Sequence, residues 1–153
     1  MKRKETREEA VKIAYSMDIN KYLDMEFTDM YIEHFELKDI DLEYLNKTVK
    51  DMLDHLDIID KHIKDNSKDW KISRIAKVDL AILRISLSEI LYNDTIPNSV
   101  SINEAVEISK KYSNEDSHKY INGILGTVVR DINIWAIIYS VSIQVHILHQ
   151  LQL

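Results

Sequence analysis

Basic and aromatic side chains meet near the N-terminus of this chain. Four cations lie within the first seven residues: Lys2, Arg3, Lys4 and Arg7. A helix places Tyr15, about two turns beyond Arg7, on roughly the same side. Cations that neutralise phosphates and a ring on which a base stacks are the parts of a single-strand RNA binder. The competing interpretation is an ordinary basic N-terminus with Tyr15 in the protein core.

A second segment with binding chemistry has the sequence EDSHKY over residues 115–120. It begins a predicted helix, whose first backbone amides are free to bind an anion. Lys119 adds a cation, and Tyr120 adds a ring. Taken alone, the segment does not distinguish a binding site from an ordinary helix start.

Catalytic and metal-binding motifs are missing from the sequence. It contains no HExxH motif, no Gly-rich phosphate loop and no dinucleotide fingerprint. His55 and His62 share a helical face, as do His146 and His149, but neither pair has the further ligands that a metal requires. His118 suggests phosphotransfer, but the surrounding HKYINGILG lacks the small residue and Lys-Gly pair of such domains. We therefore predict no enzyme activity, no metal and no cofactor.

Composition bounds the protein class and its compartment. The chain has no cysteine, which excludes disulfides and suits a reducing cytosol. Its charged N-terminus lacks an apolar signal core, so we predict a cytoplasmic protein that is not secreted. The net charge is −6, with acidic residues concentrated in 24–60 and basic residues in 1–23 and 61–84. This asymmetry favours a localised anion site, although ordinary solvated surface gives the same pattern.

The elements that position these residues are predicted to be helices. Two Gly and one Pro leave little turn chemistry for a sheet protein, so we predict an all-α fold. Apolar spacing predicts helices over 6–16, 25–36, 42–63 and 75–91, and a last helix through Val129. The helix over 75–91 is apolar on nearly every side, which places it at the centre. A polar break at 65–71 predicts a boundary between two packed subdomains, about 1–64 and 71–132.

Several local features make sharper predictions. The inward side chains are predicted to be Ala10, Ile13 and Ala14 on the first helix, and Phe27, Met30, Tyr31 and His34 or Phe35 on the second. The third helix is predicted to be unbroken because apolar residues recur at spacings of three and four from Leu42 to Ile63. Ser101–Glu104 and Ser113–Asp116 fit capping boxes. Gly123 and Gly126 predict close approach of a neighbouring backbone.

The C-terminal residues 133–153 form an atypical apolar tail. From Trp135 to Leu148 there is no Asp, Glu, Lys or Arg. Ile and Val alternate with other residues along this stretch, and this period of two predicts a strand. The stretch is too short and too interrupted by polar residues to predict a membrane span, so no membrane partner is expected.

Several segments together resemble the transcription antitermination factor NusB family. They are RKETREEAVKIAYS, ILRISLSEIL, SINEAVEISKKY and NEDSHKYINGILG, and the resemblance covers about residues 2 to 130. It implies a NusB-like fold of two packed helical subdomains with about seven helices. It also implies binding of the boxA element of nascent RNA jointly with NusE, a small-subunit ribosomal protein. Such binding would occur within an RNA polymerase antitermination complex that promotes ribosomal RNA operon transcription.

The resemblance assigns RNA contacts residue by residue. The family's basic N-terminal motif corresponds to Lys2, Arg3, Lys4 and Arg7, and its ring on the first helix to Tyr15. On the last helix its contacts correspond to Asp116 and Tyr120, beside Lys119.

Three positions depart from the family pattern. Glu5 stands where relatives often have a basic residue. Gly126 replaces an Asp and predicts early bending or fraying of the last helix. Beyond Arg130 the short polar tail of the family is replaced by the apolar one. This apolar tail is either a partner surface specific to this lineage or the result of a reading-frame error in the gene.

Two other functions fit parts of the sequence. An accessory domain of an RNA cytosine methyltransferase is one, but such enzymes add a catalytic domain with a nucleophilic cysteine, and this chain has none. A helical oligomerisation module is the other, pairing through the 42–63 seam or the tail. A homodimer of this kind is compatible with RNA binding.

Overall fold

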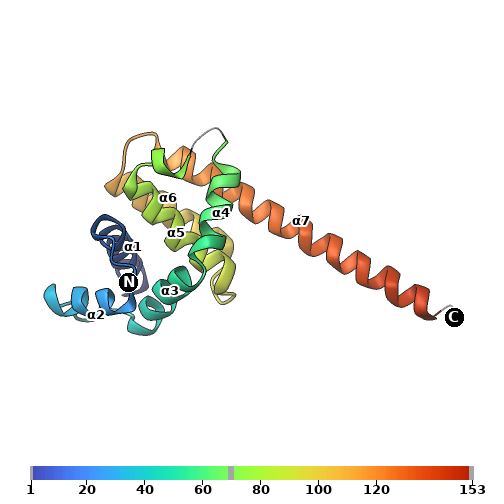
Figure 1. Cartoon of the computed structure of the whole chain (residues 1–153), viewed down its shortest axis with the longest axis horizontal. Coiled ribbons are helices and arrows are strands. Elements are labelled where there is room, and N and C mark those ends of the chain that lie inside the picture. Colours follow the sequence, from blue (N-terminus) through green and yellow to red (C-terminus); the bar gives the residue numbers. More distant parts are fainter. Residues whose placement is uncertain (1, 69–70, 152–153) are drawn as a thin grey trace.

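The computed structural model describes residues 2–68 and 71–151 of the 153-residue chain. Within these ranges there are seven α-helices, one 3-10 turn and no strand (Figure 1). Their bounds are α1 Lys2–Asn20, α2 Met25–His34, α3 Leu42–Asp54, α4 Leu56–Asn66, η1 Ile72–Arg74, α5 Lys77–Tyr92, α6 Asn98–Tyr112 and α7 Ser117–Leu151. The all-α prediction is confirmed. The predicted polar break at 65–71 includes residues 69–70, which lie outside the described ranges.

Helix α5 is the centre of the fold, as its apolar sequence predicts. Its residues from Asp79 to Glu89 are buried, and it contacts α1, α3, α4, α6 and α7. Helix α1 packs on it through Ala10, Ile13 and Ala14, as predicted. One continuous cluster of buried side chains extends from α1 to α7. The division into subdomains 1–64 and 71–132 stays a prediction.

The predicted unbroken helix over 42–63 is wrong. The chain forms α3 and α4, which meet at His55, where φ is −123° and ψ is 25°. The His55 ring stacks on Tyr92 with centroids 3.9 Å apart, a long-range contact that sequence spacing does not reveal. The seam is nevertheless buried at Leu45, Val49, Met52, Ile59 and Ile63, so it fills this chain's own core and is not free to pair with another chain.

The inward face of α2 was also predicted incorrectly in part. Phe27 and Tyr31 pack against the core, but Met30 and Phe35 are exposed, and the buried residue is Thr28. Helix α2 is short and lies at one edge of the domain (Figure 1). Fewer of its side chains therefore reach the core than the sequence pattern predicts.

Both predicted capping boxes are wrong. Helix α6 begins at Asn98 after Pro97, whose fixed φ suits a helix start, and Ser101 is buried inside it. Ser113 ends α6, and α7 begins only at Ser117. Tertiary contacts use both serines: the Ser101 hydroxyl donates to Glu89 at 3.4 Å, and the Ser113 hydroxyl donates to Asp79.

The glycine predictions and the tail prediction are wrong as well. No neighbouring heavy atom lies within 4 Å of where a Cβ would stand on Gly123 or Gly126, and α7 continues through both without ending. The predicted tail strand is helical, because a lone strand leaves its backbone hydrogen bonds unmade whereas a helix makes its own. Among the described helices, α7 is long and apolar enough to cross a membrane, judged by length and composition only.

Candidate nucleic-acid interface

One face of α1 carries the first part of the candidate interface. Lys4, Glu8, Lys12 and Tyr15 recur at helical spacing, so they form a stripe about 16 Å long. Tyr15 is 37% exposed and lies on the surface, which removes the core interpretation for this ring. The stripe borders two hollows, one against α6 and one against α2.

The hollow between α1 and α6 has mixed charge. Its cavity of about 330 Å³ is lined by Lys4, Glu8, Glu104, Glu107, Ile108, Lys110 and Lys111. Glu8 accepts hydrogen bonds from Lys111 Nζ and from the Tyr112 hydroxyl, both at 2.9 Å. Burial raises the pKa of Glu8, but these hydrogen bonds outweigh it and the pKa is lowered. The negative charge of Glu8 is thus balanced by Lys111 within the protein. Lys4 makes no ion pair within the described ranges.

The hollow between α1 and α2 is rich in aromatic rings. Its cavity of about 420 Å³ is lined by Tyr15, Tyr31, Phe35 and Tyr112, together with Lys12. Phe35 is 56% exposed and Tyr112 is 40% exposed. Lys12 Nζ lies 5.5 Å from the centroid of the Tyr112 ring. Exposed rings beside a cation provide stacking surfaces for bases and a partner for phosphate.

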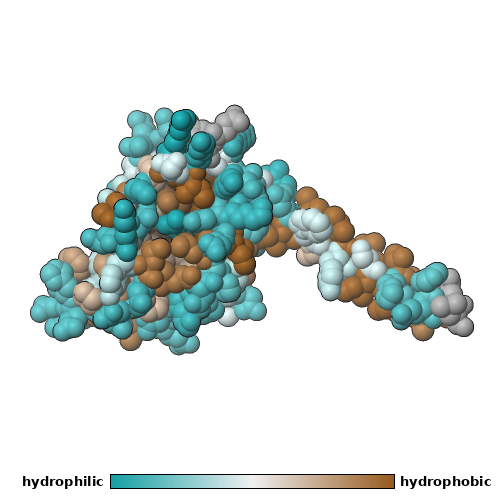
Figure 2. Space-filling model, viewed as in Figure 1, coloured by the Kyte–Doolittle hydropathy of each residue, from teal (hydrophilic) through white to brown (hydrophobic). Residues whose placement is uncertain are grey.

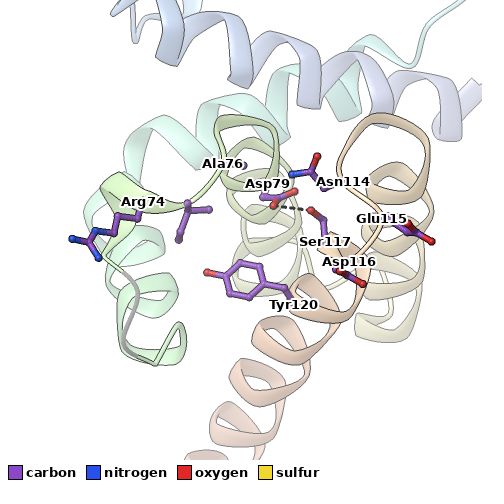
Figure 3. A pocket seen from close by; sticks show the side chains of 9 residues that line it. Arg74, Ala76, Asp79, Asn114, Glu115, Asp116, Ser117 and Tyr120 are labelled. Carbon is purple, nitrogen blue, oxygen red and sulfur yellow. Dashed lines mark hydrogen bonds between the residues drawn. The ribbon is translucent and has the colours of Figure 1, made fainter.

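A third hollow lies where α7 begins (Figure 3). Its cavity of about 620 Å³ is lined by Arg74, Ile75, Ala76, Asp79, Asn114, Glu115, Asp116, Ser117 and Tyr120. Figure 3 shows the Tyr120 ring pointing toward the η1 side, while Glu115 and Asp116 point away from that ring. Asp79 accepts a hydrogen bond from the Ser117 hydroxyl at 2.9 Å, which fixes the start of α7.

Tyr120 is the polar group in this hollow whose hydrogen bonding is incomplete. Its hydroxyl is buried and has no hydrogen-bond partner among residues 2–68 and 71–151. Burial, and then the negative charge of Asp79, raise the pKa of this phenol. The hydroxyl therefore keeps its proton at neutral pH and remains a donor for a ligand that enters the cavity.

The three hollows lie on packed helices, and the first two share a lining residue, whereas the second and third share none. Glu8 lines both the first and the second hollow. Val78 lines the second hollow, and its neighbour Asp79 lines the third. We call this surface the α1–α7 path, from Lys4 through Lys12 and Tyr15 to Tyr120. It brings together four of the sequence-predicted residues: Lys4, Tyr15, Asp116 and Tyr120.

The other predicted cations lie off this path. Lys2 and Lys119 are exposed, but neither lines a hollow. Arg3 forms an ion pair with Asp41 at 2.9 Å, and its guanidinium lies 4.5 Å from the centroid of the Tyr44 ring. The Tyr44 backbone amide, followed by Arg3, lowers the pKa of Asp41. Arg3 is thus held against α3, still half-exposed and accessible to a phosphate.

Arg7 requires a correction. Its guanidinium donates to Glu89 at 2.8 and 2.9 Å and is only 4% exposed. Tyr44 and Ser101 complete the hydrogen bonding of the same carboxylate. Burial lowers the pKa of Arg7, but the hydrogen bond and charge of Glu89 more than reverse this and raise it. A phosphate contact would require breaking this buried pair, so the structure argues against the predicted role of Arg7.

Sequence reasoning missed Lys12, Phe35, Tyr112 and Arg74. The regular stripe Lys4–Glu8–Lys12 was a signal for the first of these, since residues four apart share a helix face. A signal also existed for Arg7: Glu89 lies in the central apolar helix α5, and a carboxylate buried there needs a cation. Phe35 and Tyr112 come from distant helices, and only the tertiary fold brings them to Tyr15.

Comparisons with known proteins agree with this architecture. The sequence model of the NusB family matches residues 4–130. The transcription antitermination protein NusB of Acetivibrio thermocellus is 45% identical over 130 residues, covering 85% of this chain and 90% of the relative. That of Finegoldia magna is 38% identical over 130 residues, covering 85% and 95%.

Solved structures show the same fold. NusB of T. maritima superposes with a TM-score of 0.75 at 28% identity, covering 85% of this chain and 92% of that one. A crystal structure of the antitermination factors NusB and NusE in complex with double-stranded RNA also gives a TM-score of 0.75. Its matching chain is 25% identical, and the match covers 84% of this chain and 96% of that one.

Proposed function

The chain belongs to the NusB family, and from that premise we propose that it is an antitermination factor binding RNA together with a NusE-type ribosomal protein. The observation that carries the proposal is the α1–α7 path, which combines unpaired Lys4, the exposed ring of Tyr15 and the free hydroxyl of Tyr120. The structurally similar complex of NusB and NusE with double-stranded RNA supports joint RNA binding by the two proteins, but not the binding of a single strand.

The RNA is single-stranded in this proposal, with the boxA element as its sequence. Rings such as Tyr15 and Phe35 stack only on bases that are not already paired. The protein would act in the cytoplasm within an RNA polymerase antitermination complex on ribosomal RNA operons. These finer assignments follow the family resemblance of residues 115–125 and of the N-terminal segment.

The charge of the chain explains why RNA binding would need a partner protein. The chain carries a net charge of −6, and carboxylates such as Glu104, Glu107 and Asp116 line the path. Long-range attraction to RNA is therefore weak. A NusE-type protein would add RNA contacts of its own, so RNA affinity should rise when it is bound.

The test is a titration of labelled boxA RNA at several salt concentrations. Replacing Lys4 and Lys12 together by Ala should reduce the salt slope by up to about 1.4, since each phosphate contact on a single strand contributes about 0.7. The control replaces Lys50 and Lys61 by Ala, because both are exposed, neither lines the path, and both pair with a nearby carboxylate as Lys12 does with Glu9.

Three outcomes of this titration contradict the proposal. One is an unchanged slope in the Lys4/Lys12 variant, and another is an equal loss in the control. The third is equal RNA affinity with and without saturating NusE. This result would contradict the proposal that the two proteins bind RNA jointly. A duplex of the same sequence should compete poorly with the single strand.

A further inference from the structure

The tail, defined as residues 133–151, has no partner within the described chain. The last fully buried residue of α7 is Val128, and Ile132 still packs against the core. Every tail residue is exposed, and Figure 1 shows the helix leaving the domain and ending far from it. Such a large contiguous apolar surface marks an interaction site. The family match ends at residue 130, so the tail is not part of the shared fold.

Five apolar side chains form one regular line along the tail, while others, including Ile137, Ile143 and Ile147, lie off this line. Ile134, Ile138, Val141, Val145 and Leu148 follow spacings of four, three, four and three. This is the spacing of the paired positions in a coiled coil. The polar residues of the tail all fall at other positions of the seven-residue repeat: Asn133, Ser140, Ser142, Gln144, His146, His149 and Gln150. We call the apolar line the tail seam.

The tail seam begins where the domain ends. Continued upstream, the alternating spacing of three and four reaches Asp131, Thr127 and Ile124; the first two are not buried, whereas Ile124 is 3% exposed. The core-facing residues Ile121, Leu125 and Val128 belong to a different face. The seam therefore meets the core-packing face at Ile124 and is separate from it from Thr127 onward. Its exposed apolar part begins within one turn after Arg130, and Figure 2 shows brown atoms over much of the projecting helix.

We propose that the tail seam pairs with the tail seam of a second copy of this chain. No charged residue lies between Ile132 and Leu151, so two identical helices meet without like-charge repulsion. In a two-fold pair the same seam serves both copies, because residue i of one contacts residue j of the other and residue j contacts residue i. β-branched residues dominate both paired positions, which also permits more than two copies.

A lipid bilayer fits the tail less well than a second copy does. A membrane-spanning helix is apolar on all sides, because every side faces hydrocarbon. Here Gln144 and His146 lie in the middle of the tail, and His149 and Gln150 follow within one turn. In a pair of helices these side chains remain in water, outside the seam.

The first experiment measures the molecular mass of the full chain by light scattering. The single-copy mass is 18.0 kDa, and the protein should elute at twice this value or a higher multiple. Val141→Glu places a carboxylate in the seam and should return the mass to 18.0 kDa. Ser140→Glu places the same charge one residue away, outside the seam, and should leave the mass unchanged. Thermal unfolding of the domain should be the same in both variants, since neither position contacts it.

The second experiment uses the absence of native cysteine. Val141 lies at the centre of the seam, so in a parallel, in-register pair Val141→Cys meets its own copy. A disulfide requires Cβ atoms about 3.5–4.5 Å apart. Mild oxidation should therefore give a covalent dimer with Val141→Cys and none with Ser140→Cys.

Single-copy mass of the unmodified chain at high concentration would overturn the proposal. So would equal dissociation by Val141→Glu and Ser140→Glu, or equal crosslinking at both positions. Single-copy protein that floats with vesicles of phosphatidylcholine and phosphatidylglycerol would instead assign the tail to a membrane. RNA affinity reports the α1–α7 path independently, so failure here leaves the proposed function untouched.

Discussion

Helix α7 has two segments of similar Ile and Val content and opposite surroundings. Residues 117–132 bury Ile121, Leu125 and Val128 completely against α4, α5 and α6. The tail, 133–151, is at least as rich in Ile and Val, and none of its residues is buried. The difference shows that the partner surfaces available to a side chain decide its burial, whatever its type.

The two segments also differ in what stabilises their helical form. The first is stabilised by tertiary packing, whereas the tail depends on its own backbone hydrogen bonds. Isolated helices of such length are marginal in water. This is why pairing with another copy would contribute most in the tail, and why substitutions of similar kind should have different consequences in the two regions.

The largest contrast concerns polar groups. Glu89 is buried and bound by Arg7 and Tyr44, so Glu89→Ala leaves the Arg7 charge buried without its partner. Breaking such a pair typically costs about 3–5 kcal/mol of unfolding free energy. Ser140→Ala removes a polar group from the tail and should stay within about 0.5 kcal/mol. Urea unfolding followed by circular dichroism measures both. A loss below 1 kcal/mol for Glu89→Ala would mean that Arg7 is accessible to solvent, and would restore it as a candidate phosphate contact.

Matched leucines give the second contrast. Leu125 is fully buried, so Leu125→Ala should cost about 2–5 kcal/mol, including the cavity left behind. Leu148→Ala should cost less than about 0.5 kcal/mol of domain stability. Both are measured in a Val141→Glu background, where the tails are single-copy and pairing does not contribute. Similar losses at both positions would place the tail against the domain in solution.

Much of the fold was predictable from sequence, and the reasons for the misses are physical. The all-α class and the central position of α5 follow from local composition and periodicity. The break at His55, the start of α6 and the use of Ser101 and Ser113 depend on tertiary partners. The tail was misread because an alternating pattern indicates a strand only when another strand is present to pair with it.

The candidate site was predictable to a similar extent. Lys4, Tyr15, Asp116 and Tyr120 came from sequence and lie along one path. Arg7 was also predicted from sequence but lies off the path, because four neighbouring cations look alike in sequence while the helix turns this one toward Glu89. Phe35 and Tyr112 were missed because only the tertiary fold brings these two rings to Tyr15.

Two tyrosines on α7 give the third contrast. Tyr120 lines the hollow at the start of α7, and Tyr139 lies exposed on the tail. Tyr120→Ala should weaken boxA RNA binding about ten- to hundredfold, the value of one base–aromatic stack of roughly 1–3 kcal/mol. Tyr139→Ala should leave affinity unchanged. Affinity retained in Tyr120→Ala, with a large loss of stability, would make Tyr120 a structural ring.

The smallest contrast concerns how acidic pH changes the stability of the domain and of the tail. The tail contains no Asp or Glu, so carboxylate protonation can act only on the domain. Glu8 has a pKa lowered in the folded protein, chiefly by the hydrogen bond from Lys111, which acts against burial. A group with a lowered folded-state pKa contributes stability above its unfolded pKa of about 4.3, and that stability is lost as pH falls through the folded-state value.

Lys111→Gln tests this contribution against Lys119→Gln, which removes an equally exposed cation that makes no ion pair within the described ranges. At pH 7 Lys111→Gln should be slightly less stable than Lys119→Gln, because Glu8 loses the cation that donates to it. Well below the folded-state pKa, Glu8 is neutral in both proteins, so the difference should vanish there. The measurement is urea unfolding at pH 7 and at several acidic values. A constant difference at all pH values would mean that Lys111 stabilises the domain by packing its methylene chain on Tyr112, and that Glu8 is free to repel RNA from the path.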